Sequence, residues 1–176
     1  MTTPASSHRP TDLNLPAWCE LLDMSGQERV LEIGCGDCSF LAALAPICGE
    51  LVGLEMSAAG AVGAHEMLKQ VSKPCSLRIG SLLEFDDAAG FDVILVRRGL
   101  GHVPERERSA WCEKIARLLR PGGVVYLTDE TARADLWLSS DTGWHEGMVS
   151  SGLEIRREVM KVPAGLEVLA AKPVAA

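Results

Sequence analysis

Two glycines and one carboxylate have the spacing that a nucleoside-binding site requires. Gly34 and Gly36 stand two positions apart, and Glu55 follows Gly36 by 19 residues. Glycine lets the backbone turn sharply and lets a ligand approach it closely. A carboxylate at the end of the next strand can accept hydrogen bonds from both hydroxyls of a ribose. Together they predict a site for a nucleoside cofactor, while a tight turn and an unrelated exposed acid remain the alternatives for each feature alone.

Four residues elsewhere could contact a second substrate. His102 is the best candidate for a general base, because imidazole transfers protons readily near neutral pH. Trp18 and Trp144 could line a pocket for a small organic molecule. Glu130 follows the fifth expected strand and could contact the same molecule. Structural packing is the alternative interpretation for His102 and Trp18.

Cys35 and Cys38 form a C-x-x-C pair inside the glycine segment. Such pairs occur in redox and metal sites, but no second C-x-x-C is present. We therefore interpret the spacing as incidental and expect no metal site. The six cysteines are expected to be free thiols, because a chain of this length can build its own hydrophobic core.

Alternating strands and helices are predicted to position these residues, from short β-branched runs and from apolar residues at helical spacing. Strands are expected at residues 29–34, 51–54, 76–79, 91–96, 124–128, 153–162 and 166–171, and helices at 14–26, 38–48, 57–71, 104–120 and 132–138. The alternation predicts a parallel sheet with helices on both faces. The short connection at 163–165 predicts an antiparallel hairpin at the C-terminal end. Ligands of such sheets bind beyond the carboxyl ends of the strands, where Gly34 and Glu55 would lie.

Composition fits one globular domain over residues 14–176 preceded by a flexible arm over residues 1–13. The 176 residues are 47% hydrophobic and 23% charged, as in ordinary folded domains. The net charge of −7 argues against nucleic-acid binding, which needs a basic face. No apolar run approaches the ~20 residues that span a bilayer, and the N-terminal arm contains no apolar signal segment. We therefore expect no membrane association and a cytoplasmic location.

Four successive segments carry a family resemblance. They are Val30-Leu-Glu-Ile-Gly-Cys-Gly-Asp37, Glu55, Phe91-Asp-Val-Ile-Leu-Val-Arg-Arg-Gly-Leu-Gly-His102 and Leu118-Leu-Arg-Pro-Gly-Gly-Val-Val-Tyr126. In order and spacing they resemble the motifs of class I S-adenosylmethionine (SAM)-dependent methyltransferases, from about residue 15 to the C-terminus. The resemblance implies a three-layer Rossmann-like α/β sandwich. Its seven-stranded, mostly parallel sheet would have the order 3-2-1-4-5-7-6, with strand 7 antiparallel.

The resemblance also implies a role for individual residues of the site. It places Glu32, Gly34, Cys35 and Gly36 around the methionine moiety of SAM, Glu55 on the ribose, Met56 on the adenine, Ser81 and Leu82 at the adenine edge, Arg97 beside the cofactor and Arg98 toward the acceptor. Two positions depart from the family pattern. Ser81 stands where aspartate is common, and Cys38 stands where a third glycine is frequent.

The function that follows is SAM-dependent methyl transfer to a small-molecule acceptor by in-line displacement, with S-adenosylhomocysteine (SAH) as product. One alternative is a SAM-binding protein with a protein acceptor, or one with a regulatory or non-methylating role. A homodimer or a partner subunit could then complete the acceptor pocket, because the segments that usually build it are short here. A nicotinamide oxidoreductase is a weaker alternative, since Ser39 replaces the third glycine or alanine of that fingerprint.

Overall fold

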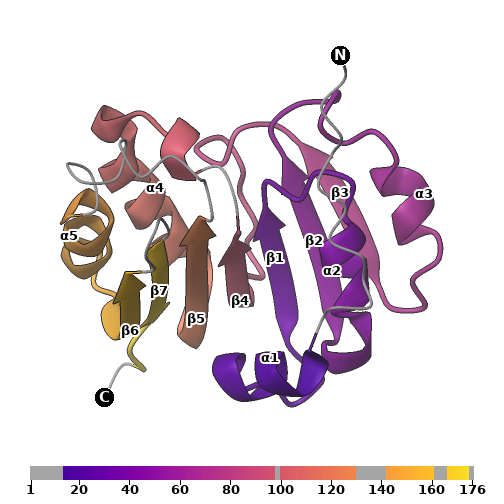
Figure 1. Cartoon of the computed structure of the whole chain (residues 1–176), viewed down its shortest axis with the longest axis horizontal. Coiled ribbons are helices and arrows are strands. Elements are labelled where there is room, and N and C mark those ends of the chain that lie inside the picture. The colour runs from indigo at the N-terminus through magenta and orange to yellow at the C-terminus, as the bar shows by residue number, and fades with distance from the viewer. Residues whose placement is uncertain (1–13, 98–99, 130–141, 161–165, 175–176) are drawn as a thin grey trace.

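Seven strands form a single sheet in the order β3-β2-β1-β4-β5-β7-β6 (Figure 1). The computed structural model describes residues 14–97, 100–129, 142–160 and 166–174. The strands are β1 (Arg29–Ile33), β2 (Glu50–Glu55), β3 (Cys75–Ile79), β4 (Phe91–Val96), β5 (Leu119–Asp129), β6 (Glu154–Met160) and β7 (Leu166–Ala171). The predicted strand order and fold class are confirmed.

The pairing of the strands confirms the expected directions. β1 lies parallel between β2 and β4, with Ile33 opposite Leu54 and Val96. β7 runs antiparallel to both β5 and β6, as the short C-terminal connection predicted. The carboxyl ends of β1, β2 and β4 therefore meet at one edge of the sheet, which is where ligands bind in open α/β folds.

Helices cover both faces of the sheet and make the three layers. α1 (Leu15–Leu22), α2 (Ser39–Ala43) and α3 (Ala64–Leu68) pack on one face, and α4 (Glu105–Leu118) and α5 (Thr142–Ser150) pack on the other. Two short 3₁₀ helices, η2 (Ala45–Ile47) and η3 (Leu100–His102), complete the described elements. Asn14 begins α1 as expected, because its side chain accepts a hydrogen bond from the Ala17 amide at 3.2 Å.

Two predicted helices are much shorter than expected, and the one expected over residues 14–26 ends at Leu22. The helix expected over residues 38–48 ends at Ala43 and resumes as η2, because Pro46 has no amide hydrogen to continue the α-helical ladder. The helix expected over residues 57–71 is confined to α3. Gly63, which precedes α3, has φ +87° and therefore turns the chain instead of continuing a helix.

The C-terminal third contains a helix that the sequence pattern did not predict. α5 includes Gly143 and Gly147, which disfavour helix on propensity alone. A Cβ atom at Gly147 would lie 2.8 Å from the Cys112 sulfur of α4, so this glycine permits close packing of the two helices. The helix expected over 132–138 lies outside the described residues.

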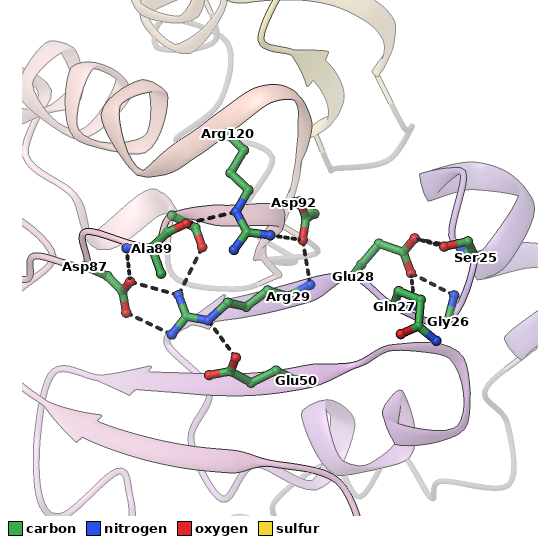
Figure 2. A network of polar contacts seen from close by, with 11 residues as sticks. Ser25, Gly26, Gln27, Glu28, Arg29, Glu50, Asp87, Ala89, Asp92 and Arg120 are labelled. Atoms are coloured by element: carbon green, nitrogen blue, oxygen red, sulfur yellow. Dashed lines mark hydrogen bonds and ion pairs between the residues drawn. The ribbon is translucent and has the colours of Figure 1, made fainter.

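A polar network fixes the amino ends of the central strands (Figure 2). The Arg29 guanidinium donates to both carboxylate oxygens of Asp87 at 2.8 and 2.9 Å and contacts Glu50 at 2.9 Å. The Arg29 amide donates to Asp92, whose carboxylate also accepts from Arg120 at 2.7 Å. The network links β1, β2, β4 and β5 at the edge opposite the carboxyl ends, so it serves the stability of the sheet and not the candidate site.

Candidate cofactor site

A tight bend follows β1 at the carboxyl edge of the sheet. Gly34 and Gly36 have φ angles of +72° and +53°, in a region that residues other than glycine rarely adopt. The amides of Gly34 and Cys35 donate to the Leu54 carbonyl at 2.7 and 3.2 Å. The two glycines form the sharp turn that their spacing predicted, and this turn is held against the end of β2.

Glu55 ends β2 and is bonded directly to this bend. Its Oε2 atom accepts a hydrogen bond from the Gly36 amide at 3.0 Å, and its Oε1 atom accepts one from the Ser57 amide at 3.2 Å. Gly60 lies against the same carboxylate, where a Cβ atom would be 2.6 Å from Oε1. Each carboxylate oxygen can accept a second hydrogen bond, so the group can serve a ribose diol while it keeps its backbone partners.

Glu32 is a buried carboxyl group with one oxygen unused. Its side chain is 4% exposed, Oε1 lies 3.6 Å from an Arg97 nitrogen, and Oε2 has no hydrogen-bond partner. Burial raises the pKa of Glu32 to about 8, the Arg97 charge opposes this shift, and the Asp37 charge adds to it. A buried polar atom without a partner is rare in folded proteins, and this one fits a donor group supplied by a ligand.

Apolar side chains lie exposed beside Glu55 at the ends of β2 and β3. Ile79 is the register partner of Glu55, and Met56 follows Glu55 in the chain. Met56 is 49% exposed and Ile79 is 50% exposed, which suits stacking against a flat apolar ring. Ile79 was not among the predicted site residues, although its place at the end of an edge strand beside an acidic strand end was a usable signal.

The two residues predicted at the adenine edge, Ser81 and Leu82, lie in different surroundings. The Ser81 hydroxyl accepts a hydrogen bond from the Leu83 amide at 3.2 Å and so shapes the turn after Gly80. Leu82 is completely buried in the core. Its side chain cannot reach a ligand, so any contact from Leu82 must come from its backbone.

Arg97 lies between Glu32 and a row of three aromatic side chains, Phe40, Trp18 and Tyr126. Its guanidinium carbon is 3.3 Å from the centre of the Phe40 ring, a cation–π contact. Trp18 packs edge-on against both Phe40 and Tyr126, with 5.2 Å between ring centres in each pair. Phe40 and Tyr126 were missed, because α2 brings Phe40 beside Arg97 only in the folded chain.

Comparison with known proteins decides the family. The model of the methyltransferase domain matches residues 30–123, more than half of the chain. The chain belongs to this family. Together with SAM-dependent methyltransferases among the solved structures of the same fold, the match confirms the resemblance to class I SAM-dependent methyltransferases and SAM as the cofactor. No curated protein matches the sequence.

Solved methyltransferase structures share the fold of the domain. N-methyltransferase NodS from Bradyrhizobium japonicum WM9 superposes with a TM-score of 0.75 at 20% identity, covering 96% of this chain and 99% of NodS. A SAM-dependent methyltransferase from Clostridium acetobutylicum ATCC 824 gives a TM-score of 0.76 at 10% identity, covering 93% and 94%. The [4+2]-cyclase SpnF gives 0.74 at 16% identity, covering 92% of this chain and 80% of SpnF. Similarity at these identities establishes the fold of this methyltransferase-family chain and not its acceptor.

The residues predicted to contact the acceptor do not all gather at this edge. Trp144 is 1% exposed and packs against Trp111 of α4, with 6.3 Å between ring centres. It is a core residue, so the prediction that it lines an acceptor pocket is not supported. His102 ends η3 and is exposed, and its role as a base stays a prediction. Arg98 and Glu130 lie outside the described residues.

Two features are absent from the parts of the chain that the structure describes. Within those parts, no helix is long and apolar enough to cross a membrane, and no group of three or more histidine, cysteine or acidic side chains could hold a metal. A shallow hollow of about 490 Å³ lies at the opposite, amino edge, bordered by residues such as Asp23, Asp92 and Arg120. It is far from the glycine bend along the strands, so we do not assign the cofactor to it.

Proposed function

We propose that this chain transfers the methyl group of SAM to a small-molecule acceptor by in-line displacement. The observation that carries the proposal is the hydrogen bond of 3.0 Å that the Gly36 amide donates to the Glu55 carboxylate. It joins a ligand-accessible backbone bend to a ribose-binding group at the edge of the sheet where cofactors bind. The family match adds that this geometry occurs in a methyltransferase domain.

The residues of the site fit the chemical parts of SAM. The unused oxygen of Glu32 would accept a hydrogen bond from the ammonium group of the methionine moiety, directly or through water. The backbone of residues 34–36 would lie along that moiety, Glu55 would accept the ribose hydroxyls, and Met56 and Ile79 would cover the adenine. Arg97 would hold Glu32 in place from the side of Phe40.

In methyl transfer from SAM, the main task of the protein is to position the reactants. When bound, SAM supplies an activated methyl group on a positively charged sulfur. The chain then has to orient the acceptor and exclude water, and such positioning can supply about 7–11 kcal/mol of the barrier reduction. We assign the acceptor side to Trp18, Arg98 and Glu130, with His102 as the base if the acceptor must lose a proton. The net charge of −7 disfavours a nucleic-acid acceptor.

Calorimetric titration with SAH tests the cofactor part of the proposal. Hydrogen bonds to a charged group contribute about 1.5–3 kcal/mol, so Glu55→Ala should weaken SAH binding by about 10- to 100-fold. Glu55→Gln keeps the shape of the side chain and separates the loss of charge from misfolding. Glu113→Ala, at an exposed carboxylate of α4, is the matched control and should bind as the wild type does. Unchanged affinity in Glu55→Ala, with its melting temperature retained, would contradict the assignment.

A second role is a protein acceptor or a non-methylating use of SAM. The likeness to the cyclase SpnF favours including it, because that fold neighbour is not described as a methyltransferase. Incubation with methyl-labelled SAM and cell extract separates the outcomes. Label in small molecules supports the proposal, label on a protein band supports a protein acceptor, and binding without transfer supports a non-methylating role.

A further inference from the structure

The two cysteines of the glycine bend touch each other. The Cys38 thiol donates a hydrogen bond to the Cys35 sulfur over 3.2 Å. Cys35 is 7% exposed and Cys38 is fully buried. Of the two residues, Cys35 is therefore the more exposed.

The backbone around the pair already has the geometry of a cross-linked turn. The Cys38 amide donates to the Cys35 carbonyl at 2.9 Å, which is the i to i+3 bond of a β-turn. The ends of such a turn lie less than about 7 Å apart, within the range of Cα separations that a disulfide bridges. Cys38 has φ +60°, a left-handed backbone conformation that residues other than glycine rarely adopt.

Space for the two sulfurs is cleared by a glycine in the neighbouring strand. Gly53 lies in the middle of β2, where a Cβ atom would be 2.8 Å from the Cys35 sulfur and 3.0 Å from the Cys38 sulfur. Glycine inside a strand weakens it and commonly marks a close approach. Here the close approach is that of the thiol pair.

From this geometry we propose that Cys35 and Cys38 form a reversible disulfide with a peroxide as oxidant, and that the disulfide weakens cofactor binding. The proposal rests on the proposed function for its second half. Gly36 lies inside the turn that the disulfide would close, and its amide donates the hydrogen bond to Glu55. Forming the bond shortens the distance between the sulfurs from 3.2 Å to about 2.05 Å. We expect this change to shift the turn around Gly36 and so to weaken the hydrogen bond of its amide to Glu55.

The reaction balances in two steps. The Cys35 sulfur attacks one peroxide oxygen, which gives a sulfenic acid and, with hydrogen peroxide, one water. The Cys38 sulfur then attacks the Cys35 sulfur, the S–S bond forms, and the hydroxyl leaves with the Cys38 proton as a second water. The two thiols lose two electrons and the peroxide gains them. The neighbouring Cys38 thiol and, after it, burial raise the pKa of Cys35, so the reaction should be slow at neutral pH and faster as pH rises.

The test combines peptide mapping with calorimetry on the full chain. Cys19 and Cys75 are half-buried and are replaced by serine throughout, so that they cannot cross-link molecules. After treatment with hydrogen peroxide, mass spectrometry should find Cys35 and Cys38 linked with the loss of two hydrogens, and a dithiol should restore them. SAH affinity of the oxidised form should be at least about tenfold lower, the loss expected for one hydrogen bond to a carboxylate.

Cys38→Ser is the matched variant, because it keeps the size of the side chain and cannot form the bond. Cys38→Gly is a second variant, since glycine accepts the φ of this position. In both, the Cys35 sulfenic acid has no partner thiol, so peroxide should produce no link, and any loss of SAH affinity should be smaller than in the linked wild type. Sulfenic or sulfinic acid at Cys35 without a link, or equal SAH affinity of the linked and reduced forms, would overturn the inference. Failure of the reduced protein to bind SAH would instead overturn the cofactor site, a distinct result because the link is measured without cofactor.

Discussion

Replacing Glu32 by glutamine should remove a pH dependence from the stability of the fold. In the folded chain, burial raises the pKa of Glu32 from 4.5 to about 8. Between these two pH values the folded state holds a proton that the unfolded state has released, so the free energy of unfolding must fall as pH rises. Glutamine resembles the protonated carboxyl group in size and hydrogen bonding and does not titrate. Wild type should therefore lose stability with rising pH relative to Glu32→Gln.

The size of the effect follows from the two pKa values. Each unit of pKa difference corresponds to about 1.4 kcal/mol. Between pH 6 and pH 7.5 the wild type should lose about 2 kcal/mol relative to Glu32→Gln, since Glu32 begins to ionise in the folded state near the upper value. Urea denaturation of both proteins at the two pH values measures this difference. The exposed control Glu84→Gln should follow the wild type.

A parallel fall of both proteins, with a stability difference that stays constant within about 0.5 kcal/mol, would refute the reasoning. It would mean that Arg97 already keeps Glu32 ionised in the fold.

The protonation state of Glu32 can also be measured through cofactor binding. If the ammonium group of the cofactor pairs with Glu32, SAH binding near pH 7 should release protons, and the calorimetric enthalpy should then depend on the ionisation enthalpy of the buffer.

Three further substitutions test the supporting structure by thermal or urea unfolding. Arg29→Met removes a half-buried clamp on Asp87 and should destabilise the fold by about 1–3 kcal/mol; the loss should shrink in acid, because Arg29 holds the pKa of Asp87 below its usual value and protonation breaks the pair. Gly53→Ala places a methyl group against the sulfurs of Cys35 and Cys38 and should lower the free energy of unfolding by about 1–3 kcal/mol. Unchanged stability would contradict this estimate and would mean that β2 shifts to make room. Lys172→Met removes two hydrogen bonds to carbonyl oxygens at the end of α4 and should cost about 1–2 kcal/mol. A melting temperature equal to that of the wild type would refute that last estimate.

The predicted strands and the central part of the site depended on local patterns and could be read from the sequence. β4 is a short apolar run dense in β-branched residues, and its buried position between β1 and β5 follows from that composition. The glycine spacing and Glu55 identified the bend and its carboxylate, because close backbone approach needs glycine whatever surrounds it. Phe40 could not be assigned in this way, because Arg97, its neighbour in the fold, lies far away in the chain. Ile79 gave a signal as the end of a strand, but its place beside Glu55 depends on the order of the strands.

Sequence alone determined the alternation of strands and helices, the C-terminal hairpin and the identity of the groups at the carboxyl edge, since each depends on residues close together in the chain. Tertiary structure decided which of these groups have partners. Trp144 is a core residue because α5 packs on α4, and α5 itself forms against propensity because Gly147 lets it approach Cys112. The unused oxygen of Glu32 also exists only in the folded chain. The surroundings of these side chains are set by packing between distant segments, which the local patterns of the sequence do not show.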